Sequence, residues 1–182
     1  MERGQEKDFG MTPLAIITDA SLGLATPEPT SWKQRTSGRA VIFDEQQNVA
    51  LLHVTKRHYH KLPGGGVEEG EDLVEALQRE AREEVGCEIT NLRELGTTEE
   101  YLSLFPLHQT SYCFIAKTRG EVKAPQFTEE EAADGFEIVW LPLDEALRTL
   151  ESETAIEDYQ GKFIHVRELA FLKEARRKLE SA

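Results

Sequence analysis

The sequence predicts a mixed α/β fold in which helices cover a sheet. Runs rich in β-branched and aliphatic residues predict strands at 39–44, 48–55, 89–98, 111–117 and 136–141. Segments of helix-forming composition lie between or after them, at 72–85, 141–150 and 161–180. Strands and helices that are interleaved within one domain form a mixed sheet with helices packed against it. A length of 182 residues suits one such domain with extra length at its ends.

The first part of the chain is expected to lie outside this domain. Within residues 1–37, the apolar stretch at 13–25 predicts either a strand or an arm that packs at the edge of the sheet. Residues 26–38 are rich in turn and loop formers and predict a linker. Residues 38–182 are expected to form the domain, including the long C-terminal helix. We assign residues 1–37 no role in the chemistry.

The elements of the domain have recognisable boundaries. A turn-like stretch at 45–47 separates the first two strands, and this spacing predicts an antiparallel pair. A Pro/Gly loop with charged flanks leads to the helix at 72–85, for which Gly86 is the expected stop. An acidic loop at 125–135 separates the last two strands, and Pro142 marks the start of a short helix.

Composition limits the classes of partner. The formal net charge is -13, which repels polyanions at long range and argues against a nucleic-acid-binding surface. Cys87 and Cys113 are too few for a disulfide scaffold, so we expect a reducing, cytoplasmic compartment. No segment approaches the roughly 20 apolar residues of a membrane helix. The expected partner is therefore a small molecule rather than nucleic acid or a membrane.

The helix predicted at 72–85 carries acidic residues on its apolar face. If Leu73 defines that face, Glu80 and Glu84 lie within about 20° of it at about 100° per residue, and Glu83 lies on the flank. An ionised carboxylate buried without a partner costs several kcal/mol, so a bound divalent cation is expected to compensate. Oxygen ligands of this kind suit Mg²⁺ or Mn²⁺. The alternative is a solvated acidic helix end beyond the edge of the sheet.

A glycine-rich loop precedes this helix. In residues 64–66 no side chain obstructs the backbone, whose amide and carbonyl groups can approach a metal or phosphate closely. The helix N-terminus adds a partial positive charge nearby. A glycine loop, a helix and inward carboxylates within 23 residues indicate one functional site.

These residues resemble the Nudix box, G-x5-E-x7-R-E-U-x-E-E-x-G-U, where U is an aliphatic or small apolar residue. Every spacing is kept, and a chance match is on the order of 10⁻⁷ to 10⁻⁶ from average residue usage. The preceding Leu-Pro-Gly-Gly also resembles the family's approach to the box. The matching residues are Gly65, Glu71, Arg79, Glu80, Ala81, Glu83, Glu84, Gly86 and Cys87.

The resemblance implies an α/β/α sandwich that hydrolyses a phosphoanhydride bond in a nucleotide-type substrate with Mg²⁺, or alternatively Mn²⁺. It implies that Glu80, Glu83 and Glu84 bind the metal, with a backbone carbonyl in the Gly64–Gly65 region as a further ligand. It also implies that Arg79 and Glu71 form an ion pair that aims the carboxylates. Alternatively, that pair only stabilises the loop. Family members are often homodimers, so a homodimer with residues 1–37 as an arm is compatible with the resemblance.

The general base is left open between two regions. Metal ions neutralise the phosphate oxygens and lower the pKa of bound water, and a carboxylate then accepts the proton of that water. Glu83 or Glu80 is the first choice. The runner-up is Glu130, which would swing over the site from the acidic loop and also bind the metal. The alternative for that loop is a solvated run of charge.

A basic cluster before the box is the expected substrate contact. In strand alternation Arg57, Tyr59 and Lys61 share one face, while His60 lies on the other. One set is expected to bind phosphates while Tyr59 or His60 stacks on a base. The alternative is a charged edge strand that discourages aggregation. No downstream signature of a Nudix subfamily is present, so the substrate stays open among a nucleoside triphosphate, an oxidised nucleotide and a nucleotide sugar.

Two classes of function remain in competition. The first is an active nucleotide pyrophosphohydrolase, and the second is a catalytically silent Nudix-like module that senses nucleotides. Such modules typically lose one or more box carboxylates, whereas this sequence keeps them all. An acidic Ca²⁺-binding protein is disfavoured because no EF-hand-like alternation of oxygen ligands occurs. We therefore favour the enzyme.

Overall fold

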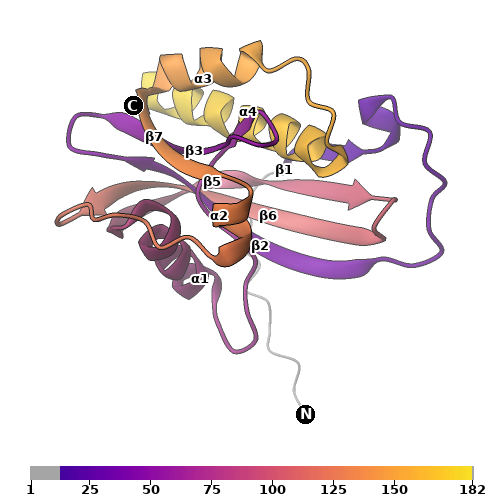
Figure 1. The fold of residues 1–182 in the computed structure, drawn as a ribbon, viewed down its shortest axis with the longest axis horizontal. Coiled ribbons are helices and arrows are strands. Elements are labelled where there is room, and N and C mark those ends of the chain that lie inside the picture. Colours follow the sequence, from indigo (N-terminus) through magenta and orange to yellow (C-terminus); the bar gives the residue numbers. More distant parts are fainter. Residues whose placement is uncertain (1–12, 182) are drawn as a thin grey trace.

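A computed structural model describes residues 13–181 and shows a mixed sheet between two layers of helices (Figure 1). The predicted α/β/α sandwich is confirmed. The strands are β1 Pro13–Thr18, β2 Lys33–Phe43, β3 Asn48–Val54, β4 Tyr59–Lys61, β5 Glu88–Leu102, β6 Leu107–Arg119 and β7 Phe136–Pro142. The helices are α1 Leu73–Glu80, α2 Glu129–Ala133, α3 Leu143–Ser152 and α4 Tyr159–Glu180, with short helical turns at Ala20–Leu22 and Ala81–Val85.

Strand alternation builds a separate core on each face of the sheet. In β2, Ile42 faces α1 and packs with Leu77, while its neighbour Val41 faces the other way and packs with Leu147 of α3 and Phe171 of α4. Burying each large apolar side chain contributes roughly 1.5–3 kcal/mol. None of the helices within residues 13–181 is long and apolar enough to cross a membrane.

The sheet has the strand order β1-β5-β6-β2-β3-β4, with β7 also paired to β3. The pairs β1–β5 and β2–β6 are parallel, and the other pairs are antiparallel, including the predicted pair of β2 and β3. That pair is joined at a single position, Phe43 opposite Val49. The N-terminal half of β2 is therefore free on this side to hold another segment.

The N-terminal segment differs from its prediction. Residues 13–18 form β1, one of the two expected options, and pair with β5. The expected linker is wrong in its second half, because β2 begins at Lys33 and the boundary drawn between residues 37 and 38 falls inside this strand. β2 pairs with β6 from Lys33 to Phe43. Turn-forming residues are tolerated in a strand when neighbouring strands hold its backbone on both sides.

The predicted helix at 72–85 begins and ends as expected but changes geometry in the middle. Asp72 caps it by accepting hydrogen bonds from the Val74 and Glu75 backbone N–H groups, and the Glu75 carboxylate accepts one from Asp72 N–H in return. From Ala81 to Val85 the coil widens to a π-helical turn. Gly86 then ends it with a left-handed φ of 79°.

Candidate active site

β2 holds the glycine loop in place through its backbone. Gly38 N–H donates to Gly65 O at 2.9 Å, Ala40 N–H donates to Pro63 O at 3.1 Å, and Val67 N–H donates to Thr36 O at 3.0 Å. Residues 63–67 thus run along the free side of β2 like a short strand. The segment expected to be a linker is therefore the support on which the loop lies.

Gly65 and Glu80 meet so closely that a side chain at position 65 would displace the Glu80 carboxylate. A Cβ atom at Gly65 would overlap Oε1 of Glu80. The glycine therefore allows the carboxylate to lie directly against the loop backbone. The Gly65 carbonyl accepts from Gly38 N–H, and the Gly64 carbonyl accepts from Nη1 of Arg39. Each carbonyl keeps a second lone pair that can accept a metal or a donor.

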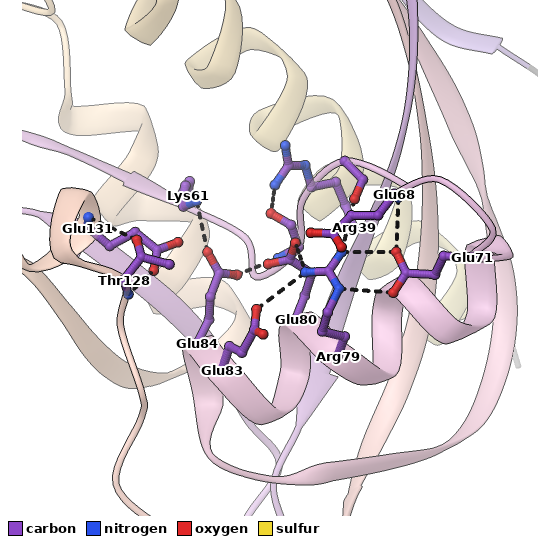
Figure 2. Close-up of polar contacts among 12 residues, drawn as sticks. Arg39, Lys61, Glu68, Glu71, Arg79, Glu80, Glu83, Glu84, Thr128 and Glu131 are labelled. Carbon is purple, nitrogen blue, oxygen red and sulfur yellow. Dashed lines mark hydrogen bonds and ion pairs between the residues drawn. The ribbon is translucent and has the colours of Figure 1, made fainter.

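Glu84 is the buried carboxylate of the site (Figure 2). Its Oε2 accepts a hydrogen bond from Gly64 N–H at 2.6 Å, and its Oε1 lies 3.0 Å from Nζ of Lys61. Burial raises the pKa of Glu84, while the Lys61 ammonium and the Gly64 N–H act in the opposite direction. Lys61 also lies over the ring of Phe136, 4.7 Å from its centroid.

Arg79 joins the loop to the carboxylates. Its Nε and Nη2 donate to the two oxygens of Glu71 at 2.9 and 3.0 Å, and Nη2 also donates to Gly66 O at 3.0 Å. Its Nη1 lies 2.8 Å from Glu80 Oε1 and 3.3 Å from Glu83 Oε2. The hydrogen bonds to Glu71 raise the pKa of Arg79, and those from Arg79 lower the pKa of Glu71. The bidentate pair fixes the direction of the guanidinium.

The box carboxylates (Glu80, Glu83 and Glu84) differ in exposure as the helical spacing predicts. The Glu84 side chain is 1% exposed, Glu80 is 12% exposed and Glu83 is 39% exposed. In the described part of the chain, no three acidic, histidine or cysteine side chains are gathered tightly enough to hold a metal unaided. Lys61 and Arg79 instead lie against the carboxylates. An all-oxygen donor set with one wholly buried carboxylate still fits a hard divalent cation.

The acidic loop approaches the box without bringing Glu130 into contact with it. Gln126 N–H donates to Glu83 O at 2.6 Å, which ties the loop to the box. Thr128 and Glu131 form the capping box of α2 and lie beside Lys61 and Glu84 in Figure 2. Glu130 is exposed, and across residues 13–181 its carboxylate forms no hydrogen bond or ion pair. Its assignment to the metal stays a prediction.

Only one member of the expected substrate cluster reaches the box. Lys61 does so, whereas Arg57 forms ion pairs with Asp134 at 3.0 Å and Asp158 at 3.3 Å. Tyr59 is buried, and burial raises its pKa to about 12. The strand alternation predicted for Arg57, Tyr59 and Lys61 does not extend to Arg57, because β4 starts only at Tyr59.

His60 belongs to a histidine cluster away from the box. Its Nδ1 lies 2.5 Å from Oε1 of Glu153, and its ring stacks on that of His53 with centroids 4.3 Å apart. Trp140 packs against the core cluster that includes Ile42. The structure therefore places the four sequence-predicted substrate residues in different environments, and their roles in binding stay predictions.

Sequence reasoning missed a buried ion cluster made of Arg39, Glu100, Arg167 and Glu168. Nη1 of Arg167 lies 3.1 Å from both oxygens of Glu100, and its Nη2 lies 2.7 Å from Oε1 of Glu168. Burial acts to raise the pKa of Glu100, but Arg167, Gln109 and Arg39 together outweigh it and the pKa is lowered. Arg39 connects this cluster to the glycine loop through the Gly64 carbonyl. A lone arginine before the apolar run at 40–43 was the signal available in the sequence.

The fold and site together define a class of protein: a helix–sheet sandwich in which a glycine loop packs against the carboxylates of an acidic helix. A family model described as the NUDIX domain matches residues 33–165. The chain therefore belongs to the Nudix family, as its box resemblance predicted. Nudix hydrolases generally use divalent metals.

Two curated relatives share part of this chain. CMP-5'-(N-acetyl-N-hydroxy-3-aminopropyl)phosphonate hydrolase from Streptomyces rubellomurinus is 31% identical over 134 residues, which cover 67% of this chain and 62% of that protein. The human 8-oxo-dGDP phosphatase NUDT18 is 34% identical over 108 residues, which cover 57% of this chain and 31% of that protein. The matched regions thus span less than two thirds of either relative.

Solved structures share the fold at lower identity. The MutT protein from Methanosarcina mazei Go1 has a TM-score of 0.54 at 19% identity, covering 82% of this chain and 99% of that one. The E. coli ORF135 protein has a TM-score of 0.55 at 18% identity, covering 83% and 94%. At this identity the likeness establishes the fold alone.

Proposed function

We propose that this chain is a divalent-metal-dependent pyrophosphohydrolase that cleaves a phosphoanhydride bond in a nucleoside di- or triphosphate linked to another moiety. The observation that carries the proposal is the wholly buried Glu84 carboxylate, held between Gly64 N–H and Lys61 beside two further carboxylates. Burying an ionised carboxylate at a glycine loop costs free energy unless a cation binds it. The names of both curated relatives contain a nucleotide, which supports a nucleotide-type substrate.

Glu80, Glu83, Glu84 and a carbonyl of the Gly64–Gly65 loop would hold the metal. When bound, Mg²⁺ or Mn²⁺ supplies neutralisation of the phosphate oxygens and a lowered pKa for water. Arg79 keeps Glu80 and Glu83 aimed at one point because it contacts both through a single nitrogen. The Lys61 ammonium, which needs only to rotate off Glu84, would bind a substrate phosphate.

Glu83 is our first choice for the group that accepts the proton of the attacking water. It is the most exposed of the box carboxylates and so the one that water reaches most easily. Glu80 is the alternative within the box. Glu130 is the runner-up, since it stands on a short helix tied to the box through the Gln126–Glu83 hydrogen bond. A proton acceptor needs to come within hydrogen-bond reach of its water.

The test is hydrolysis of a panel of nucleoside di- and triphosphates, nucleotide sugars and dinucleotides with Mg²⁺ and with Mn²⁺. Glu84→Gln should lower kcat by at least about 100-fold, because it removes the buried charge from the proposed metal site. Circular dichroism should show an intact fold. Glu145→Gln, an exposed residue of α3, is the matched control and should keep wild-type activity.

Two outcomes would contradict the proposal. One is a Glu84→Gln variant that turns over at the wild-type rate. The other is a wild-type protein that hydrolyses no member of the panel with either metal but binds nucleotides. The second result would instead support the silent sensing module.

A further inference from the structure

A pocket of about 710 Å³ opens next to the glycine loop. Residues 33–36 of β2, Val67 and residues 105–107 of the β5–β6 turn line it. β2 and β6 pair in register here, with Lys33 opposite Leu107, so the start of β2 and the turn lie at the same end of the sheet (Figure 1). The mechanism described above uses none of these side chains.

The pocket is continuous with the Nudix loop. A Cβ atom at Gly66 would lie 3.0 Å from both Nε and Nη2 of Arg35, so the Arg35 guanidinium rests against this glycine. The carbonyl of the same glycine accepts the hydrogen bond from Nη2 of Arg79. Gly66 therefore separates Arg35, which faces the pocket, from Arg79, which faces the carboxylates. Only Gly66 therefore separates a molecule in the pocket from Gly65, against which the Glu80 carboxylate lies.

Two basic side chains line the pocket, neither with a carboxylate partner in the part of the chain that the structure describes. The formal net charge is -13, and Arg57, Lys61 and Arg79 each form an ion pair with at least one carboxylate. Lys33 and Arg35 are exposed, and no carboxylate of residues 13–181 forms an ion pair with either. In an acidic protein, two unpaired cations at a concave surface attract an anionic ligand.

An aromatic ring stands beside these cations. Phe105 is 52% exposed, and its ring contacts Tyr159 edge-on at a centroid distance of 5.9 Å. Pro106 and Leu107 extend the apolar wall. Ligand sites typically combine an apolar wall with a few placed polar groups. Arginine suits a phosphate because its planar fork binds two oxygens at once, and an exposed aromatic face suits a flat base.

We propose that this pocket binds the nucleoside monophosphate portion of the substrate, with its phosphate on Arg35 and Lys33 and its base against Phe105. The inference rests on the proposed function, because it assigns a place to part of the same substrate. It moves substrate recognition from the strand before the box to the start of β2. Before the box, Arg57 is already paired with Asp134 and Tyr59 is buried. Arg35 at the start of β2 and Phe105 in the neighbouring turn are exposed instead.

The first test measures binding without turnover. Wild-type protein in EDTA is titrated with AMP, GMP, CMP and UMP, and with ribose 5-phosphate as a probe that lacks a base. We expect at least one nucleoside monophosphate to bind. Arg35→Ala should weaken both kinds of probe by about tenfold or more, and Phe105→Ala should weaken the nucleotides by about tenfold but not ribose 5-phosphate. Arg148→Ala, an exposed arginine of α3, is the matched control and should leave every affinity unchanged.

The second test separates binding from chemistry. For the best substrate of the panel, Arg35→Ala and Phe105→Ala should raise KM by about tenfold while kcat stays within about threefold, because these contacts are the same in the ground and transition states. Backbone NMR shifts on adding the nucleotide should concentrate at residues 33–36, 67 and 105–107.

Three results would overturn the inference: no nucleotide binding in EDTA up to about 10 mM, equal affinity in Arg35→Ala and wild type, or NMR shifts confined to residues 56–61. Failure of the proposed function has a different signature. In that case no substrate is hydrolysed, while nucleotide binding in the pocket persists and still depends on Arg35.

Discussion

Two clusters of acids and bases lie on either side of the glycine loop, and they differ in charge balance. The box carboxylates with Glu71 place four acids against only two cations, Lys61 and Arg79, which leaves a formal charge of -2 when all are ionised. In the buried ion cluster, two arginines face two glutamates and the formal charge is zero. A divalent cation would cancel the surplus of the first cluster, whereas the formal charge of the second is already balanced within the chain.

Exposure separates the two clusters in the same way. All four members of the buried ion cluster are buried, while Glu83 of the box is 39% exposed. Two buried glutamates show the consequence in their pKa values. Burial raises the pKa of Glu84, whereas at Glu100 the effect of burial is outweighed by Arg167, Gln109 and Arg39 together and the pKa is lowered. We therefore expect a glutamate to serve ligand binding where the charge of its cluster is unbalanced, and to serve the fold where that charge is balanced.

The largest expected effect tests whether the buried ion cluster is purely structural. Glu100→Gln leaves Arg167 short of a negative charge in the interior and should lower the free energy of unfolding by about 3–5 kcal/mol. Denaturant titration measures this change. At a temperature where the variant is folded, its kcat should stay within a few-fold of wild type. A loss of activity without a loss of stability would contradict a purely structural role for the buried ion cluster.

The next effect tests the contact between the loop and the box carboxylates. Gly65→Ala should lower kcat by about 100-fold, because the new methyl group displaces the Glu80 carboxylate and a shift of about 1 Å costs that much. Steady-state kinetics with Mg²⁺ measure the change. Gly120→Ala is the control: the site has open space but a φ of 75°, so this variant should lose stability and keep its kcat. Wild-type turnover in Gly65→Ala would show that Glu80 does not need the loop.

The smallest effect is on the pH dependence of stability. The pKa of Glu100 is lower in the folded chain than in the unfolded one, so the unfolded state binds the proton first as pH falls. The stabilisation by this carboxylate is present above its unfolded pKa and is lost as pH falls through its folded pKa. Urea titrations across the acid range should therefore show a shallower fall in stability for Glu100→Gln than for wild type. Parallel curves would contradict the assigned direction.

Local pattern predicted the elements and the box correctly. The apolar runs at 39–44 and 48–55 mark β2 and β3, because strands covered by helices on both faces of a sheet bury successive side chains. Helical spacing placed Glu80 and Glu84 inward and Glu83 on the flank, and their exposures follow that order. Both successes depend on residues within a few positions of one another.

The errors arose where distant segments meet. Residues 33–38 have the composition of a linker, and only pairing with β6 and with the loop at 63–67 makes them a strand. The turn at 56–58 interrupted the expected alternation before Tyr59, so Arg57 and Lys61 point to different partners. Contacts of this kind depend on where other elements pack, which a local pattern does not encode.

The sequence by itself determined the acidic helix, its glycine loop and the orientation of the carboxylates, because helix periodicity and glycine's lack of a side chain act over a single turn of chain. Only the tertiary structure decided that β2 supports the loop, that Lys61 reaches Glu84, and that Arg39, Glu100, Arg167 and Glu168 balance one another in the interior. Apart from the pair of neighbours Arg167 and Glu168, those contacts join residues that are far apart along the chain. They matter because burial of charge is tolerated only where an opposite charge lies beside it.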